Sequence, residues 1–131
     1  MSSDQTQLQL RKFASALDTL TETAADDEDR KTRDSLLLRF VYTFEMAWQC
    51  MRAVLQDHGD DETPRVAFAV LETGFTVGYI TDAALWKSLR EGRNRVSHVY
   101  DESMAIALSA MVRVDAIPEF ERLLKRFQGE A

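Results

Sequence analysis

The chain has 131 residues and a formal net charge of −6, and 45% of its residues are hydrophobic and 29% charged. This length and balance predict one globular domain spanning residues 1–131 and exclude a chain that is mainly disordered. The acidic charge also argues against nonspecific coating of nucleic acid, because phosphate contacts need Lys and Arg. A site for RNA or a nucleotide must therefore be a local basic patch.

The cysteine content and the lack of long apolar runs indicate a cytoplasmic protein without a membrane-spanning segment. Cys50 is the one cysteine, which excludes an intramolecular disulfide and fits a reducing compartment. No apolar run approaches the ~18–20 residues of a membrane helix, and the first residues lack the pattern of a signal peptide. Two histidines and one cysteine cannot form an ordinary zinc site, and no glycine-rich phosphate loop occurs. We therefore expect neither a metal nor a cofactor.

Apolar spacing predicts two long helices in the first half of the chain. Residues 10–24 carry one stripe, residues 25–31 form a polar break, and residues 37–55 carry the strongest stripe. The second helix is expected to stop over residues 57–61, where Gly59 suits a C-terminal cap. The first stripe consists of Leu10, Phe13, Leu17, Leu20 and Ala24, and the second of Leu37, Phe40, Phe44, Trp48, Met51 and Leu55.

Shorter helices are predicted in the second half. Thr63 is expected to cap one that ends at Gly74, and residues 74–80 are expected to form a loop. Thr81 or Asp82 would cap the next helix. A final stripe contains Pro118, which should kink or restart its helix. This stripe consists of Met104, Ala107, Met111, Val114, Phe120, Leu124 and Phe127.

Together these elements predict an all-α fold, an up-and-down bundle of four to five helices. The second and final stripes carry more large apolar side chains than one bundle of this length readily buries. We therefore expect a homodimer.

The segment 87–102 carries the residues suited to chemistry. Lys87, Arg90, Arg93 and Arg95 gather four positive charges, followed by His98 and Tyr100. Arginine offers a planar fork to phosphate oxygens, and histidine can move a proton near neutral pH. On a continuous helix Arg93 and His98 would lie roughly 140° apart. They converge only if the helix breaks, which a cap at Asp101 allows, or if two copies share the site. The alternative is a solvated helix end with His98 and Tyr100 as half-buried packing residues.

Residues 93–102 resemble the R-N-x-x-x-H-x-Y motif of HEPN proteins, and are most similar to the nucleotidyltransferase substrate-binding subunit family. Residues 39–48 resemble that family's F-E-x-x-W helix, and residues 63–74 its S-P-R segment. The dipeptide at 85–86 and residues 117–120 also resemble that family's pattern. The matching blocks span roughly residues 33–128 in the family's order.

The resemblance implies a dimeric helical bundle encoded beside a minimal nucleotidyltransferase, and it implies two functions. The first is a toxin with metal-independent RNase activity, which the partner neutralises by transferring AMP to a tyrosine. The alternative is a noncatalytic subunit that binds a nucleotide or another substrate for the partner. A helical adaptor without either function is a third interpretation, which the Arg, His and Tyr cluster disfavours.

Under the toxin interpretation, the resemblance implies that Arg93 binds the phosphate, that Asn94 orients it and that His98 acts as general acid and base. Tyr100 would be the modified residue. The weaker candidates for substrate binding are Arg90, Arg95 and Glu45, the last of which would orient Arg93 from a neighbouring helix.

Overall fold

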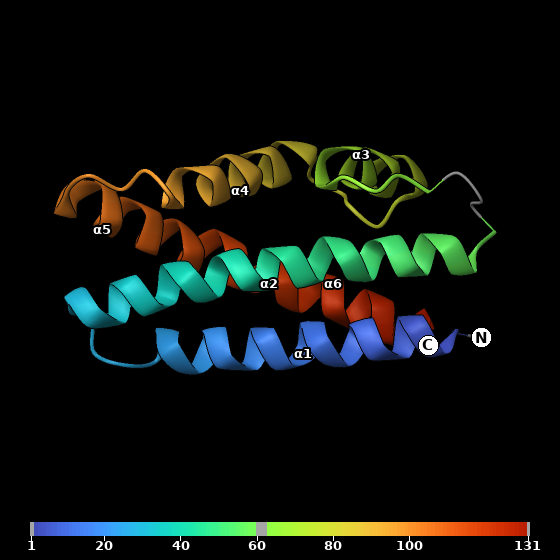
Figure 1. Ribbon diagram of the computed structural model, residues 1–131, viewed down its shortest axis with the longest axis horizontal. Coiled ribbons are helices and arrows are strands. Elements are labelled where there is room, and N and C mark those ends of the chain that lie inside the picture. The colour runs from blue at the N-terminus through green and yellow to red at the C-terminus, as the bar shows by residue number, and fades with distance from the viewer. Residues whose placement is uncertain (1, 60–62, 131) are drawn as a thin grey trace.

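The computed structural model describes residues 2–59 and 63–130. Two long helices, α1 (Asp4–Ala24) and α2 (Arg30–Asp57), run antiparallel beside each other (Figure 1). The Asp29 side chain accepts a hydrogen bond from the backbone N–H of Thr32 at 2.8 Å and so caps α2. The predicted break between the helices is present, but it is shorter than residues 25–31 because this cap starts α2 at Arg30.

The predicted glycine cap at the end of α2 is confirmed. His58 is the last partly helical residue, and Gly59 follows it with a φ of 84°. This left-handed conformation costs a glycine little, because it has no Cβ. Residues 60 and 61 of the predicted stop lie outside the described residues.

Helix α3 (Ala67–Val77) begins later than the sequence predicts, so the expected cap at Thr63 is wrong. Val66 precedes the helix and provides no side-chain cap. Arg52 of α2 donates a hydrogen bond from Nε to the carbonyl oxygen of Pro64 at 3.0 Å. This contact ties the segment before α3 to α2, and the tertiary interaction overrides the local capping signal.

Helix α3 also ends later than predicted, because Gly74 lies inside it. A Cβ at Gly74 would collide with the sulfur of Met51, so this glycine lets α3 approach α2 closely. The helix ends instead at Gly78, whose φ is 96°. The expected loop over residues 74–80 is therefore correct only for its last three residues.

Helices α4 (Ala83–Val96) and α5 (Glu102–Met111) both begin at predicted caps. Asp82 accepts a hydrogen bond from the backbone N–H of Leu85 at 3.0 Å, and Asp101 accepts one from that of Met104 at 2.8 Å. The helix therefore breaks between residues 96 and 102, within the motif segment.

A π-helical turn (Val112–Ala116) joins α5 to α6 (Ile117–Glu130). It ends two residues before Pro118, where the sequence predicts a kink or restart. The predicted stripe is wrong in its first half, since Val114 is 71% exposed. The second half is confirmed at Phe120 and Phe127, which are buried. In the first half the buried apolar positions are Ala105, Leu108, Val112 and Ala116.

The described residues form helices and no strand, and α5, the π-helical turn and α6 make one continuous rod, so five helical rods result. The predicted all-α bundle of four to five helices is confirmed. Helix α2 is central, and α1, α3, α4, α5 and α6 all pack on it. No helix within 2–59 and 63–130 has the length and apolarity needed to cross a bilayer. The rings of Phe13, Phe40, Phe44, Phe120 and Phe127 are fully buried in the core.

Candidate functional site

The cationic side chains of α4 are spread over three sides of the helix. Lys87 and Arg90 line a groove shared with α3, whereas Arg93 contacts α2. Arg95 lines a hollow shared with α5. Successive residues of an α-helix turn by about 100°, so neighbouring arginines necessarily point to different partners. The basic segment is therefore several separate surfaces.

Arg93 is held in place by α2. Its Nε and Nη2 atoms lie 3.0 Å and 2.7 Å from Oε1 of Glu45. The second carboxylate oxygen of Glu45 accepts a hydrogen bond from the indole Nε1 of Trp48 at 2.8 Å. The Arg93 side chain nevertheless remains 36% exposed. The contact from Glu45 that the resemblance implies is therefore present, and it orients a guanidinium that solvent can reach.

His98 and Tyr100 lie in the turn that follows α4. The backbone N–H of His98 donates to the carbonyl oxygen of Arg95 at 2.8 Å, and the two rings are 6.4 Å apart. Both side chains are exposed, Tyr100 by 81%, which excludes the half-buried packing role. Asn94 is exposed on α4.

Arg93 lies on α4, whereas His98 lies in the turn that follows this helix. No hydrogen bond, ion pair or ring contact joins them in the described residues. The predicted helix break is present, but it leaves the two side chains on separate elements. A site that uses both would bring the end of α4 and this turn to one ligand.

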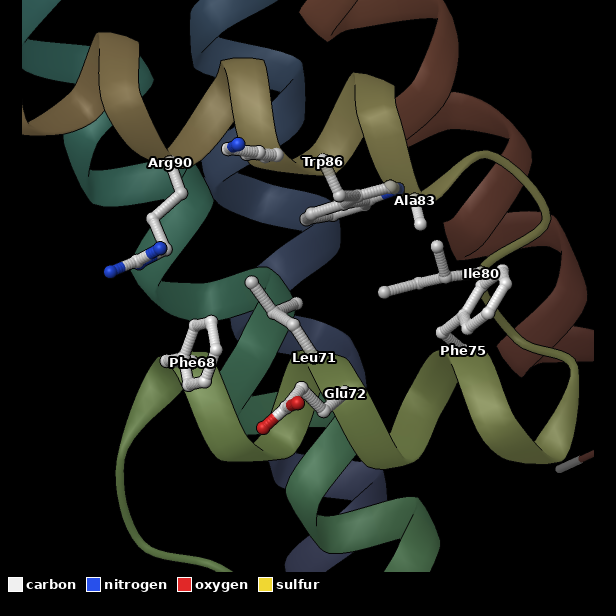
Figure 2. A pocket seen from close by; sticks show the side chains of 9 residues that line it. Phe68, Leu71, Glu72, Phe75, Ile80, Ala83, Trp86 and Arg90 are labelled. Atoms are coloured by element: carbon white, nitrogen blue, oxygen red, sulfur yellow. The ribbon is translucent and has the colours of Figure 1, made fainter.

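A groove with a volume of about 310 Å³ lies between α3 and α4 (Figure 2). Phe68, Leu71 and Phe75 line its α3 side, and Trp86 lies on its α4 side. The Arg90 guanidinium carbon lies 4.8 Å from the centroid of the Phe68 ring, a cation–π contact.

The remaining histidine and the cysteine lie apart from these surfaces. Burial raises the pKa of the Cys50 thiol to about 12, so this side chain behaves as a small apolar group. His58 lies at the end of α2 and its Nε2 is 3.1 Å from a carboxylate oxygen of Glu130. The described residues contain no group of three or more His, Cys, Asp or Glu side chains arranged to hold a metal ion.

Sequence reasoning missed two features of these surfaces. The indole of Trp48 holds Glu45, a contact that the i, i+3 spacing of the two residues indicates. The groove was missed because α3 was predicted to stop at Gly74. Phe68, Leu71 and Phe75 have the i, i+3, i+7 spacing of one helical face once the helix continues beyond that glycine.

Comparisons with known proteins agree with this architecture. A protein from Thermus thermophilus superposes with a TM-score of 0.78 and 29% identity, over 88% of this chain and 98% of that chain. HI0074 of Haemophilus influenzae superposes with a TM-score of 0.79 and 24% identity, over 91% of this chain and 98% of its own. The description of HI0074 is the fold of a substrate-binding domain of a nucleotidyltransferase. A search of curated proteins finds no match.

A family model described as "Nucleotidyltransferase substrate binding protein like" matches residues 8–129. This match covers the helix with Glu45 and Trp48, the groove, and the turn with His98 and Tyr100. The resemblance seen in the motifs is thus confirmed at the level of the family. The chain belongs to the nucleotidyltransferase substrate-binding-like family.

Proposed function

We propose that this chain is the substrate-binding subunit of a two-chain nucleotidyltransferase, and that Arg93 binds an anionic group of the substrate or nucleotide. The observation that carries the proposal is that Glu45 holds the Arg93 guanidinium in place while the Arg93 side chain remains 36% exposed. A guanidinium has five N–H donors, and the contacts with Glu45 leave donors for a phosphate or carboxylate. Preorganisation by Glu45 and Trp48 lowers the entropy lost on binding.

The catalytic step would be supplied by the partner chain. This sequence has no G-S…D-x-D signature of the kind that nucleotidyltransferases use to hold their two metal ions. The family is one of substrate-binding-like domains, and the related structure HI0074 is described as such a domain. The partner would therefore transfer the nucleotide, while this chain would position the acceptor.

Arg93→Gln tests this proposal against a matched control, Arg95→Gln. Both variants remove one charge from the same helix, but Arg95 lines the hollow beside α5. In the complex with the partner nucleotidyltransferase, we expect Arg93→Gln to raise the KM for the substrate about tenfold or more and to leave kcat within about threefold, because a charge-assisted pair is lost. Arg95→Gln should change KM less than about threefold. Equal effects of the two variants would contradict a site at Arg93.

The second candidate function is the RNase toxin, which the exposure of His98 and Tyr100 favours. Arg93 would bind the scissile phosphate, with Asn94 orienting it. His98 would accept the proton of the attacking 2′-hydroxyl and return one to the leaving 5′-oxygen. A homodimer would supply Arg93 and His98 to one site from two copies. Light scattering that shows a stable 15 kDa monomer at micromolar concentration would contradict this dimer.

Expression with and without the partner separates the two candidates. The toxin function predicts growth arrest that coexpression of the partner relieves. Arg93→Ala and His98→Ala should each abolish this arrest. The wild type should also show RNase activity that is insensitive to EDTA. Normal growth without the partner would favour the binding subunit. Full toxicity of the two alanine variants would contradict the proposed mechanism.

Tyr100 would be the residue that the partner modifies under the toxin function. Each transferred AMP adds one phosphodiester charge beside the site, where it would pair with Arg93. Intact-mass spectrometry after coexpression should show whole AMP units on the wild type. These adducts should disappear in Tyr100→Phe and persist in Tyr42→Phe, a control with another exposed tyrosine. An adduct elsewhere would contradict this role.

A further inference from the structure

The groove between α3 and α4 is lined by none of Arg93, His98 and Tyr100. We propose that it binds a small amphipathic anion, a compound with an aromatic or aliphatic body and one phosphate or carboxylate group. This site uses residues other than those of the proposed function, and the present proposal does not depend on that function.

The floor of the groove fits an apolar body. Phe68 and Phe75 are half exposed, although both are large aromatic side chains on the same short helix. Figure 2 shows both on the α3 side of the groove, with Trp86 and Ile80 also lining it. Burial of an apolar ring against these side chains removes exposed apolar surface from water, which is the main favourable contribution in such sites. The volume of about 310 Å³ is at the small end of the range for ligand pockets.

The α4 side of the groove provides the positive charge. Lys87 and Arg90 both line it, and neither forms an ion pair with a carboxylate in the part of the chain that the structure describes. The contact between Arg90 and the face of Phe68 leaves the N–H donors of the guanidinium unused by that ring. Two unpaired cations beside an apolar floor in an acidic protein complement an anion attached to an apolar body.

Glu72 determines how the ligand is oriented in the groove. It lies on the α3 side, whereas the two cations come from α4. An anion beside Glu72 would be repelled, so the anionic group should lie at the α4 side and the apolar body over the phenylalanines. Glu72→Gln should therefore strengthen binding.

Calorimetric titration with 1-naphthyl phosphate tests this proposal, with inorganic phosphate and 1-naphthol in parallel titrations. The two fragments each satisfy half of the site. We expect 1-naphthyl phosphate to bind at least about tenfold more tightly than either fragment, because both halves are then engaged at once. Amide chemical shifts should change in α3 and in the first half of α4.

The double variant Lys87→Gln/Arg90→Gln should weaken the binding of 1-naphthyl phosphate about tenfold and leave that of 1-naphthol unchanged. Its matched control is Arg11→Gln/Lys12→Gln, which removes the same charge beside another hollow, between α1 and α2. The control should bind as the wild type does. Phe75→Ser should weaken the binding of both aromatic compounds, because it removes part of the floor.

Equal affinity for 1-naphthyl phosphate and inorganic phosphate would overturn the proposal. So would an equal loss of affinity in the two double variants, or amide chemical-shift changes centred outside α3 and α4. Glu72→Gln keeps the test decisive if the double variant does not fold, since unchanged or weaker binding there also contradicts the site. Arg93→Gln should leave the chemical-shift changes in α3 unchanged, because Arg93 does not line the groove, so failure of this proposal is distinguishable from failure of the proposed function.

Discussion

Two glutamates make the same pair of contacts in different surroundings. Glu119 accepts a hydrogen bond from the indole Nε1 of Trp86 at 2.6 Å and pairs with Arg122 at 2.6 Å. Glu45 likewise accepts one from an indole, at 2.8 Å, and pairs with Arg93. The Glu119 side chain is only 8% exposed, whereas that of Glu45 is 27% exposed.

Burial and the remaining donors distinguish the two clusters. Trp86 is buried, and Arg122 also donates to the carbonyl oxygen of Tyr79 at 2.9 Å, so this cluster joins α4, α6 and the loop after α3. Its polar groups are directed at one another, which stabilises the bundle. The Arg93 and Arg122 side chains are about equally exposed, 36% and 37%, but within the described residues Glu45 is the one hydrogen-bond partner of the Arg93 guanidinium. The same residue types thus form a structural cluster at one place and a candidate binding site at the other.

The largest effect should come from breaking the buried cluster. Glu119→Ala leaves the indole N–H of Trp86 buried without its acceptor and Arg122 without its carboxylate, so we expect a loss of about 3 kcal/mol in the free energy of unfolding. Glu45→Ala should lose about 1 kcal/mol or less, because water replaces its contacts. Urea denaturation measures both. Losses of equal size would contradict the distinction between the two clusters.

A smaller effect should follow from changing the loop that carries the Tyr79 carbonyl group. Gly78 has a φ of 96° and ends α3 directly before Tyr79. Gly78→Ala should therefore destabilise the fold by about 1 kcal/mol, since alanine adopts this conformation at a cost. Thermal unfolding followed by circular dichroism measures this loss. Gly129→Ala, in the last turn of α6 with open space around it, is the control and should be neutral or slightly stabilising.

Double-mutant cycles compare the two ion pairs directly. The cycle for Glu45→Ala with Arg93→Ala should give a coupling energy of about 0.5–1 kcal/mol, as partly exposed pairs do. The cycle for Glu119→Ala with Arg122→Ala should give a larger value, about 2 kcal/mol, because Glu119 is buried. A larger coupling at Glu45 would show that its pair has a structural role as well.

The smallest effect concerns a third carboxylate, Glu130. Burial raises its pKa, but hydrogen bonds from Tyr79, His58 and Arg126 outweigh burial and hold the pKa below its ordinary value of 4.5. A lowered pKa in the folded state stabilises the fold above pH 4.5, and this contribution is lost as the pH falls through the folded value. Tyr79→Phe should reduce the loss of stability on acidification below about pH 4.5. An unchanged acid profile would contradict the role of this hydrogen bond.

Local signals in the sequence predicted much of the fold. Asp82 and Asp101 each accept the hydrogen bond expected of an N-terminal cap, since capping depends on residues three positions apart. The cap expected at Thr63 failed because Arg52, on the preceding helix, binds the adjoining backbone. The role of Gly74 depends likewise on Met51 in another helix. Local patterns do not contain such contacts.

The contact between Arg93 and Glu45 was predictable from the motifs, but the arrangement of the other motif residues around it was not. The motifs predicted that Arg93, His98 and Glu45 belong to one site, and the structure pairs only the first with the last. That pair depends on how α4 packs on α2. The separation from His98 follows from where α4 ends, a boundary that apolar spacing defines poorly. The groove was missed for the same reason, since it requires α3 to extend past Gly74.

The π-helical turn between α5 and α6 has a consequence for insertions and deletions. The buried positions Leu108, Val112, Ala116 and Phe120 follow one another at steps of four. On a regular α-helix each such step drifts by about 40°, so three of them would leave one face. The wider turn over residues 112–116 absorbs this drift.

The chain thus carries one residue more in this rod than an α-helix with the same buried face requires. Removal of Val114, which is exposed, would change the steps to four, three and four, the spacing of an ordinary helix. Combined with Pro118→Ala, which restores the missing N–H donor, the deletion should convert the rod into an uninterrupted α-helix that buries the same side chains. This turn is therefore the place inside a helix where the length of the chain can change by one residue while the core stays intact.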